Sequence, residues 1–355
     1  MKFKRSNNLS TETFPSHLMR QRLIISFDNM HTLQPLTVSH WLPFYISISN
    51  FLRQRAYAGA ILLAVIFMTT SAKGQRNSGN MQLLMNYEDS LKQINDVILD
   101  GSEQGIRQNA CYDFIKKLVE ALKVEGSFDY PFDSLTRISI LTPEDKSFRI
   151  FNWQLPLTSG KQRFFGAIQM RNGKELKLFP LYDYSDYILH PADTITDNEK
   201  WFGALYYRIM EVKGNGKKYY MLFGWDGNNM TSNKKILEVL SFSKQKEPVF
   251  GAAIFNFGKE SDRNAIMRFI LEYKKDAQVS LNYDADLQMI TFDHLIPQDA
   301  STKDLPYTYV PDGSYEAFQW KHGKWNYFDN VFTSTMTEVP FPNPVDFGKD
   351  KYKRK

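Results

Sequence analysis

The sequence predicts an α+β protein that is mainly β, with an N-terminal helical hairpin followed by an antiparallel β-meander. Between residues 78 and 124, apolar residues recur every three or four positions, which is the period of an amphipathic helix. From about Leu135 the period falls to two, and glycine or asparagine separates the short apolar runs, as in a series of antiparallel strands. Aromatic residues, which favour strands, make up 15% of the chain. A sandwich, an open barrel or a small propeller would each fit this pattern.

An export segment is expected before the helices. The apolar run Ala56–Met68 follows Arg53 and Arg55 and is followed by small residues, which together are typical of a secretory signal peptide. The run is short for a membrane-spanning helix, which needs about 20 apolar residues. We therefore expect a signal peptide at 52–74, cleaved before Gln75. An uncleaved anchor in the inner membrane is the alternative.

Residues 1–51 fit this interpretation poorly, because the basic region of a signal peptide is short. We expect them to be an extension from a wrongly assigned start codon, with translation beginning at Leu52. Residues 75–355 hold 36 basic and 37 acidic residues, so the folded part is nearly neutral. A nucleic-acid-binding domain would carry a basic patch or stripe. The basic tail at 341–355 is interpreted as a solvated terminus, and no nucleic-acid partner is expected.

The helical hairpin is expected over residues 75–126. Gly101 is predicted to end the first helix, and Ser102 to cap the second. The single cysteine, Cys111, excludes a disulfide framework and is expected to be a buried thiol. Two apolar stripes define the faces that pack on a larger body: Leu84, Tyr87, Leu91, Ile94 and Ile98, then Ile106, Ala110, Phe114, Leu118 and Leu122.

The antiparallel β body is expected over residues 127–340. Asn172-Gly173 is a strong hairpin signal between two apolar runs. Gly214-Asn215-Gly216 and His322-Gly323 separate two further pairs of runs. Both faces of the segment 219–225 carry bulky residues, so this strand is predicted to be central and covered on both sides.

Recognisable catalytic patterns are missing from the sequence. No histidine has the spacing of a zinc protease, no serine lies in a Gly-x-Ser-x-Gly turn, and no phosphate-binding glycine loop is present. No metal site and no cofactor are predicted. Asp293 and His294 are neighbours on a predicted strand, so their side chains should point to opposite faces.

Weak site candidates remain at the ends of strands. Glycoside hydrolysis needs two carboxylates flanking the scissile bond, and aromatic side chains stack on sugar rings. The candidate catalytic residues are therefore the acids and the histidine near strand ends or turns: Asp226, Asp293, His294 and Asp312. The candidate binding residues are Trp201, Trp225 and Asn228.

Six segments of the chain form a distinctive set. They are FRIFNWQLP (148–156), FFGAIQ (164–169), WFGALYY (201–207), YYMLFGWDGNN (219–229), FDHLIP (292–297) and PDGSYEAF (311–318). As a set they resemble segments of a family of uncharacterised exported proteins of the Bacteroidota type, over residues 81–332. The resemblance implies export from a Gram-negative cell, and it brings no activity and no catalytic residue.

These observations lead to two expectations for function. The first is an exported, soluble, periplasmic or secreted protein without catalytic activity, which binds a protein or glycan partner in the envelope and has no stable membrane span after cleavage. The second is a hydrolase that acts on a glycan or an envelope polymer with paired aspartates. Two acids close together in one cleft would favour the hydrolase, and scattered acids in surface turns would favour the binding protein.

Overall fold

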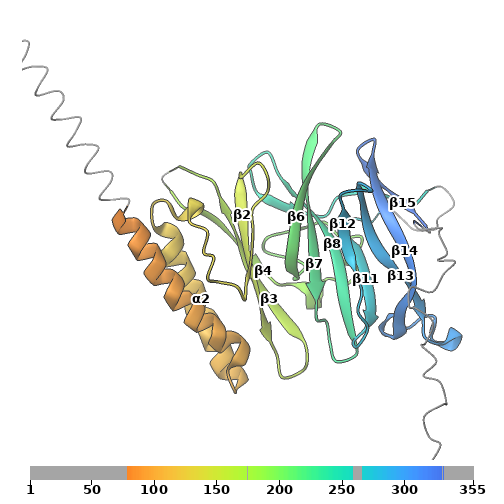
Figure 1. The fold of residues 1–355 in the computed structure, drawn as a ribbon, viewed down its shortest axis with the longest axis horizontal. Helices are drawn as coiled ribbons and strands as arrows, with labels where there is room; N and C mark the ends of the chain where they lie inside the picture. Colours follow the sequence, from red (N-terminus) through yellow and green to blue (C-terminus); the bar gives the residue numbers. More distant parts are fainter. Residues whose placement is uncertain (1–77, 174, 259–265, 330, 332–355) are drawn as a thin grey trace, which may run out of the picture. The chain divides into compact units, whose positions relative to one another are not determined.

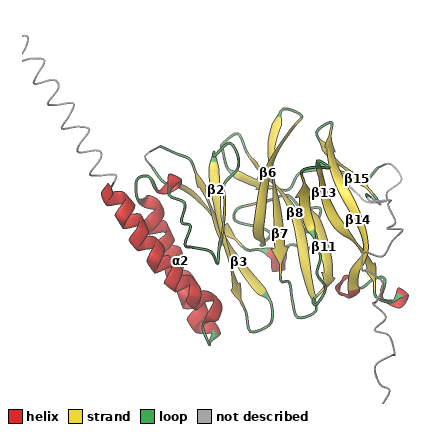
Figure 2. Ribbon diagram, in the orientation of Figure 1, coloured by secondary structure: helices red, strands yellow, loops and turns green. Residues whose placement is uncertain are grey.

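The computed structural model describes residues 78–173, 175–258, 266–329 and 331. The expected extension at 1–51, the signal peptide at 52–74 and the basic tail at 341–355 lie outside these residues. The described residues belong to one compact unit, Ser71–Lys355. Two helices come first in this unit, and strands follow, as the sequence predicts (Figure 1; Figure 2).

The predicted helical hairpin is confirmed. The first helix covers residues 78–100, and α2 spans Gln104–Lys123. Ser102 does not cap α2, because the N-cap residue is Glu103. Ile106 of the predicted stripe is 44% exposed. The guanidinium of its neighbour Arg107 donates to the carbonyl oxygen of Gly101 in the turn between the helices and to that of Pro156 at the end of β2. The other predicted stripe residues are buried or partly buried: Leu84, Tyr87, Leu91, Ile94, Ile98, Ala110, Phe114, Leu118 and Leu122.

The first sheet lies against these helices, and its four strands pair antiparallel in chain order. The strands are β1 (Ser139–Leu141), β2 (Phe148–Pro156), β3 (Gln162–Met170) and β4 (Lys177–Tyr182). The strands β3 and β4 are the hairpin expected on either side of Asn172-Gly173. Trp153 and Phe151 of β2 share an apolar core with Phe114 of α2, which fixes the helices to this face.

The central sheet has six strands, and β7 lies between β6 and β8. The strands are β5 (Thr196–Asp197), β6 (Leu205–Gly214), β7 (Lys217–Asp226), β8 (Ser232–Phe242), β9 (Pro248–Phe250) and β11 (Phe269–Lys274). Residues 219–224 of β7 are all buried, so the predicted burial of this strand on both faces is confirmed.

The third sheet has five strands. They are β10 (Phe255–Asn256), β12 (Leu281–Asp284), β13 (Met289–Pro297), β14 (Tyr309–Lys321) and β15 (Lys324–Phe328). The predicted β14–β15 hairpin turns at His322 and Gly323, and only the short β10 pairs parallel, with β15. Four short 3₁₀-helices also lie in the described part: η2 (Ser127–Asp129), η3 (Ser185–Tyr187), η4 (Ala300–Thr302) and η5 (Pro306–Thr308).

Three apolar cores join these elements into layers. One core lies between the helices and the first sheet, a second between the first and central sheets, and a third between the central and third sheets. The order of layers is therefore helices, first sheet, central sheet and third sheet (Figure 1). The sheets stack as in a sandwich, and none of them closes into a barrel in the described residues. No helix in the described part of the chain is long and apolar enough to cross a membrane.

Candidate functional site

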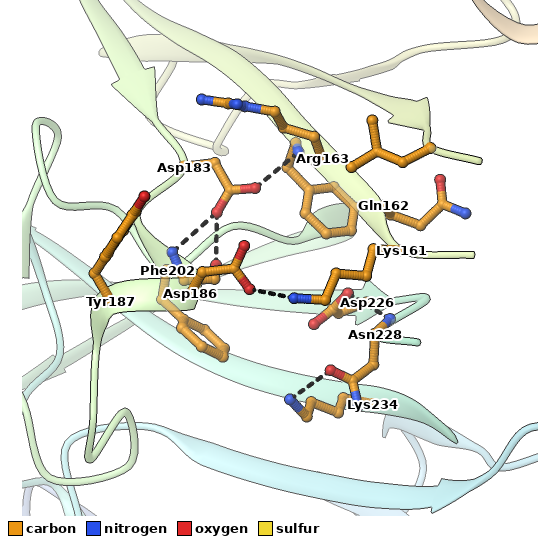
Figure 3. Close-up of a pocket in the computed structure, with 13 residues that line it drawn as sticks. Lys161, Gln162, Arg163, Asp183, Asp186, Tyr187, Phe202, Asp226, Asn228 and Lys234 are labelled. Atoms are coloured by element: carbon orange, nitrogen blue, oxygen red, sulfur yellow. Dashed lines mark hydrogen bonds and ion pairs between the residues drawn. The ribbon is translucent and has the colours of Figure 1, made fainter. Parts of the chain in front are cut away.

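A polar pocket of about 190 Å³ lies where the first sheet meets the central sheet (Figure 3). Its walls come from four segments that are far apart in the sequence: the start of β3 with the loop before it, the residues after β4, Phe202 before β6, and the turn between β7 and β8 with the start of β8. The charged and polar side chains in these walls include Lys161, Asp183, Asp186, Asp226, Asn228 and Lys234. We call this the polar pocket.

Asp183 is fixed by hydrogen bonds on one side of the polar pocket. Its Oδ2 accepts from the backbone N–H of Phe164 at 2.9 Å, and its Oδ1 accepts from the backbone and the hydroxyl of Ser185 at 3.1 and 2.6 Å. The Ser185 hydroxyl oxygen accepts in turn from the N–H of Gly203 at 2.7 Å. Asp183 therefore joins β3, η3 and the segment after Trp201 at one point.

Asp226 ends β7 and is 7% exposed. Its Oδ1 accepts from the backbone N–H of Asn228 at 2.7 Å. Burial raises the pKa of Asp226 to about 6, and the charges of Asp183 and Glu272 act in the same direction, while the bond from Asn228 and the charge of Lys234 oppose the shift. A substantial part of Asp226 is therefore protonated at mildly acidic pH.

Asn228 holds the β7–β8 turn together. Its backbone is left-handed, with φ of 33°, a conformation that asparagine tolerates better than most residues. Its amide nitrogen donates to the Ser232 hydroxyl at 2.7 Å and to Glu272 at 3.2 Å, and its oxygen accepts from Lys234 at 2.9 Å. Both ends of the Asn228 amide are thus engaged inside the protein, and Lys234 is held at the pocket wall.

The outer rim of the polar pocket is more exposed. Lys161 Nζ forms an ion pair with Asp186 at 2.8 Å, with both side chains about half exposed or more. The hydrogen bond and charge of Asp186 raise the pKa of Lys161. Tyr187 is 70% exposed, and its ring lies 4.8 Å from the ring of Tyr184. Figure 3 shows Lys161 reaching across the pocket to Asp186, which lies on the same side as Tyr187.

Of the candidates from the sequence, Asp226 and Asn228 line the polar pocket, and the two tryptophans do not. Trp201 is fully buried and donates its indole N–H to the Tyr206 hydroxyl at 2.8 Å. Trp225 precedes Asp226 on β7, so its side chain lies on the other face of the central sheet. The aromatic side chains in the pocket wall are Phe164, Tyr187 and Phe202.

The other three candidates lie together on the third sheet. His294 Nδ1 is 2.9 Å from Asp312 Oδ2, at the edge between β13 and β14. Asp293 is 7% exposed and accepts from the N–H of Ser280 at 2.5 Å, whereas the His294 side chain is 39% exposed. The two neighbours thus differ in burial, and a register shift between Asp293 and Leu295 interrupts the regular alternation of β13 at His294. Burial raises the pKa of Asp293, and hydrogen bonds from Ser314 lower the pKa of Asp312 to about 2.

Asp226 and Asp293 lie on opposite sides of the central sheet. Asp226 is influenced by the charge of Lys234, and Asp293 by that of Lys235. Lys234 and Lys235 are neighbours on β8 and therefore point to opposite faces. These two aspartates do not share a cleft, and the other acids in the wall of the polar pocket are instead Asp183 and Asp186, which the sequence analysis did not select.

A signal for the missed pocket residues does exist in the sequence. The segment 182–187 reads YDYSDY, where two acids and three tyrosines directly follow an apolar strand. Within the described residues, no group of three or more His, Cys, Asp or Glu side chains is arranged to hold a metal ion. Comparisons of the chain with protein-family models, with curated proteins and with solved structures find no match.

Proposed function

We propose that the chain is an exported binding protein whose polar pocket holds a glycan of the cell envelope or the surroundings. The observation that carries this proposal is the combination, at one pocket, of fixed polar groups in the wall with the exposed aromatic ring of Tyr187 at the rim. Sugar rings present hydroxyl groups around the edge and an apolar C–H face. A site with hydrogen-bonding groups and an accessible aromatic face matches both features.

The fixed geometry of the wall supports binding. Asp183 and Asn228 are held by several hydrogen bonds each, so little side-chain entropy is lost when a ligand arrives. Near pH 6, Asp226 is present both as a carboxyl and as a carboxylate, so it can donate to or accept from a ligand hydroxyl.

Export rests on the sequence features of residues 52–74, and the periplasm or the extracellular space is the proposed location. N-terminal sequencing of the protein isolated from its native host tests this part. A mature chain that begins at Gln75 supports export with cleavage. A chain that begins upstream of residue 53 contradicts it.

The binding test uses calorimetric titration with two sets of probes: peptidoglycan fragments released by lysozyme, and oligosaccharides of xylose, mannose and galacturonic acid. At least one set is expected to bind, and Tyr187→Ala should weaken that binding at least tenfold. Tyr307→Ala is the matched control, because Tyr307 is 41% exposed and does not line the polar pocket. The proposal is contradicted if no probe binds. It is also contradicted if Tyr187→Ala and Tyr307→Ala lose the same affinity for the probe that binds.

Hydrolysis of a glycan is the second candidate, and the raised pKa of Asp226 favours it. Glycosidases use one carboxyl with a raised pKa as general acid and a second carboxylate as base or nucleophile. Asp226 would be the acid and Asp183 the partner, because its charge contributes to the raised pKa of Asp226. Release of reducing ends over several hours separates the two functions. Turnover that Asp226→Asn abolishes, with binding retained, would favour the hydrolase.

A further inference from the structure

A second pocket, of about 310 Å³, lies between α2 and the first sheet. Its walls are apolar and come from Ile115 and Val119 of α2 and from Phe165, Ala167 and Leu178 of the sheet. We call it the apolar pocket. Its volume is about twice that of an engineered cavity of roughly 150 Å³ that binds benzene. It is therefore large enough for a hydrocarbon chain of several carbons.

A small residue of β3 leaves this space open. Ala167 lies on the helix-facing side of β3, the same side as Phe165, and a larger side chain there would fill the gap between α2 and the sheet. Its neighbour Gly166 faces the central sheet, where a Cβ atom would lie 2.9 Å from the carbonyl oxygen of Phe151 and 3.0 Å from Leu181. The space is thus built into the packing of the first sheet.

The floor of the apolar pocket is formed by the stacked rings of Trp153 and Phe165, and the indole N–H of Trp153 has a hydrogen-bond partner. The rings of Trp153 and Phe165 stack at 6.0 Å with an angle of 11° between their planes. The Trp153 indole N–H donates to the Cys111 sulfur at 3.3 Å. The indole therefore presents a flat apolar surface to whatever enters the pocket.

Arg163 is the one charged side chain that lines the apolar pocket. It is exposed, and it has no hydrogen bond and no ion pair among the residues that the structure describes. In Figure 3 its guanidinium extends away from Lys161 and Asp226. Tyr112 and Tyr182, 56% and 57% exposed, stand at the mouth as well. A guanidinium at the mouth of an apolar pocket is suited to a carboxylate, which it can bind through two parallel hydrogen bonds.

We propose that the apolar pocket binds a free fatty acid, with the hydrocarbon chain between α2 and β3 and the carboxylate paired with Arg163. The positive charge at the mouth selects an anionic headgroup, and the limited volume selects a single chain. The proposal does not rest on glycan binding at the polar pocket, because Arg163 is the one lining residue that the two pockets share.

A chain-length series tests the pocket directly. Calorimetric titration of the full mature chain with alkanoates of six to fourteen carbons, each below its micelle concentration, should give saturable binding at one site. Affinity should rise roughly threefold to fourfold with each added methylene, as expected for burial of apolar surface, and then level off when the pocket is full. Binding that is not saturable, or that ignores chain length, overturns the proposal.

The headgroup contact is tested with Arg163→Gln and with a neutral ligand of matched length. The variant should bind dodecanoate about tenfold more weakly than the wild type and bind dodecanol equally well. Arg171→Gln is the control, because it removes the same charge from an exposed position of the first sheet that is paired with Asp129. If Arg163→Gln loses as much affinity for dodecanol as for dodecanoate, the role of Arg163 is overturned. The same holds if Arg171→Gln weakens dodecanoate binding as much as Arg163→Gln does.

The chain site is tested with Ala167→Phe, which fills the space under α2 and should abolish binding of dodecanoate and dodecanol. If this variant does not fold, Val119→Trp, a partly exposed position on the helix side, closes the pocket from the other wall. The proposed site is contradicted if either variant folds and still binds dodecanoate with wild-type affinity.

Discussion

Arg268 Nε lies 2.7 Å from Glu238 Oε2, and both side chains are fully buried. Arg268 also donates to the carbonyl oxygens of Pro191 and Thr194 and to the hydroxyl of Thr196. Burial raises the pKa of Glu238, and the charge of Arg268 opposes that rise. The pair therefore fixes the segment before β5 to the central sheet, close in sequence to Tyr187 of the polar pocket.

Arg268→Met should destabilise the protein strongly. It leaves the Glu238 carboxyl buried without its partner and removes the donors to the loop at 191–196. Breaking one side of a buried ion pair costs about 3–5 kcal/mol. The measurement is urea-induced unfolding followed by tryptophan fluorescence at pH 7.

A double variant separates the charge from the packing. Glu238→Leu combined with Arg268→Met removes both charges, and its loss of stability should be smaller than that of Arg268→Met alone. A double variant that is less stable than Arg268→Met would show that the hydrogen bonds of Arg268 to the loop, and not the lone carboxylate, dominate the cost.

Asp226→Asn should change the pH dependence of stability in a defined direction. The folded-state pKa of Asp226 is about 6, above its ordinary value near 4, so the folded state holds a proton that the unfolded state releases between these values. Wild-type stability therefore falls as pH rises through this window. The variant lacks this loss, so its unfolding free energy relative to the wild type should increase by about 2–3 kcal/mol between pH 4 and pH 7.

The measurement is a set of urea unfolding curves from pH 4 to pH 7 for the wild type and two variants. Asp286→Asn serves as the control, because Asp286 is an exposed aspartate in the β12–β13 turn. The raised pKa of Asp226 would be contradicted if the difference in unfolding free energy between Asp226→Asn and the wild type stayed constant from pH 4 to pH 7.

The hairpins were predictable because their signals are local. At Asn215 and Gly216 the backbone φ angles are 51° and 72°, and at His322 and Gly323 they are 55° and 75°. Two successive left-handed residues make the turn whose twist matches the flanking strands, and short-range sequence shows it. The helices were predictable for the same reason, since their apolar stripes repeat within one turn or two.

The layer order and the polar pocket depend on contacts between distant segments. Arg149 of β2 illustrates this: the residue is 3% exposed, and its guanidinium donates to the carbonyl oxygens of Ser127 and Tyr130 and to the side-chain oxygen of Gln169. Nothing local to Arg149 indicates these partners. Asp183 and Asp226 likewise meet only because the first sheet packs on the central one, so the sequence pointed to Asp226 and not to Asp183.

Gly203→Ala should destabilise the protein and disturb the polar pocket. A Cβ atom at this position would lie 2.5 Å from the Asp183 carboxyl, which cannot move without losing its bonds to Phe164 and Ser185. Overpacking of this kind costs about 1–3 kcal/mol. Gly105→Ala is the matched control. It lies in α2 with nothing within 4 Å of the new Cβ, so stability should be unchanged or rise by about 0.5–1 kcal/mol. Equal effects of the two changes on the thermal midpoint would rule out the steric argument.

The Cys111 thiol should be inert in the folded protein, as its predicted and confirmed burial implies. It is fully buried, and burial raises its pKa to about 11. Thiolate is the reactive form, so at pH 8 both access and ionisation oppose reaction with Ellman's reagent. We expect no reaction over an hour in native buffer and complete reaction within minutes in guanidinium chloride.

Slow reaction in native buffer would then report opening of the helix–sheet core, because the thiol must leave its contact with Trp153 to react. Arg149→Gln removes bonds that hold the segment 127–130 to the first sheet, so it should speed the reaction. Lys116→Gln, an exposed change on the outer face of α2, should leave the rate unchanged. A fast native reaction in the wild type would mean that the helices separate from the first sheet far more often than the buried contacts of Cys111 imply.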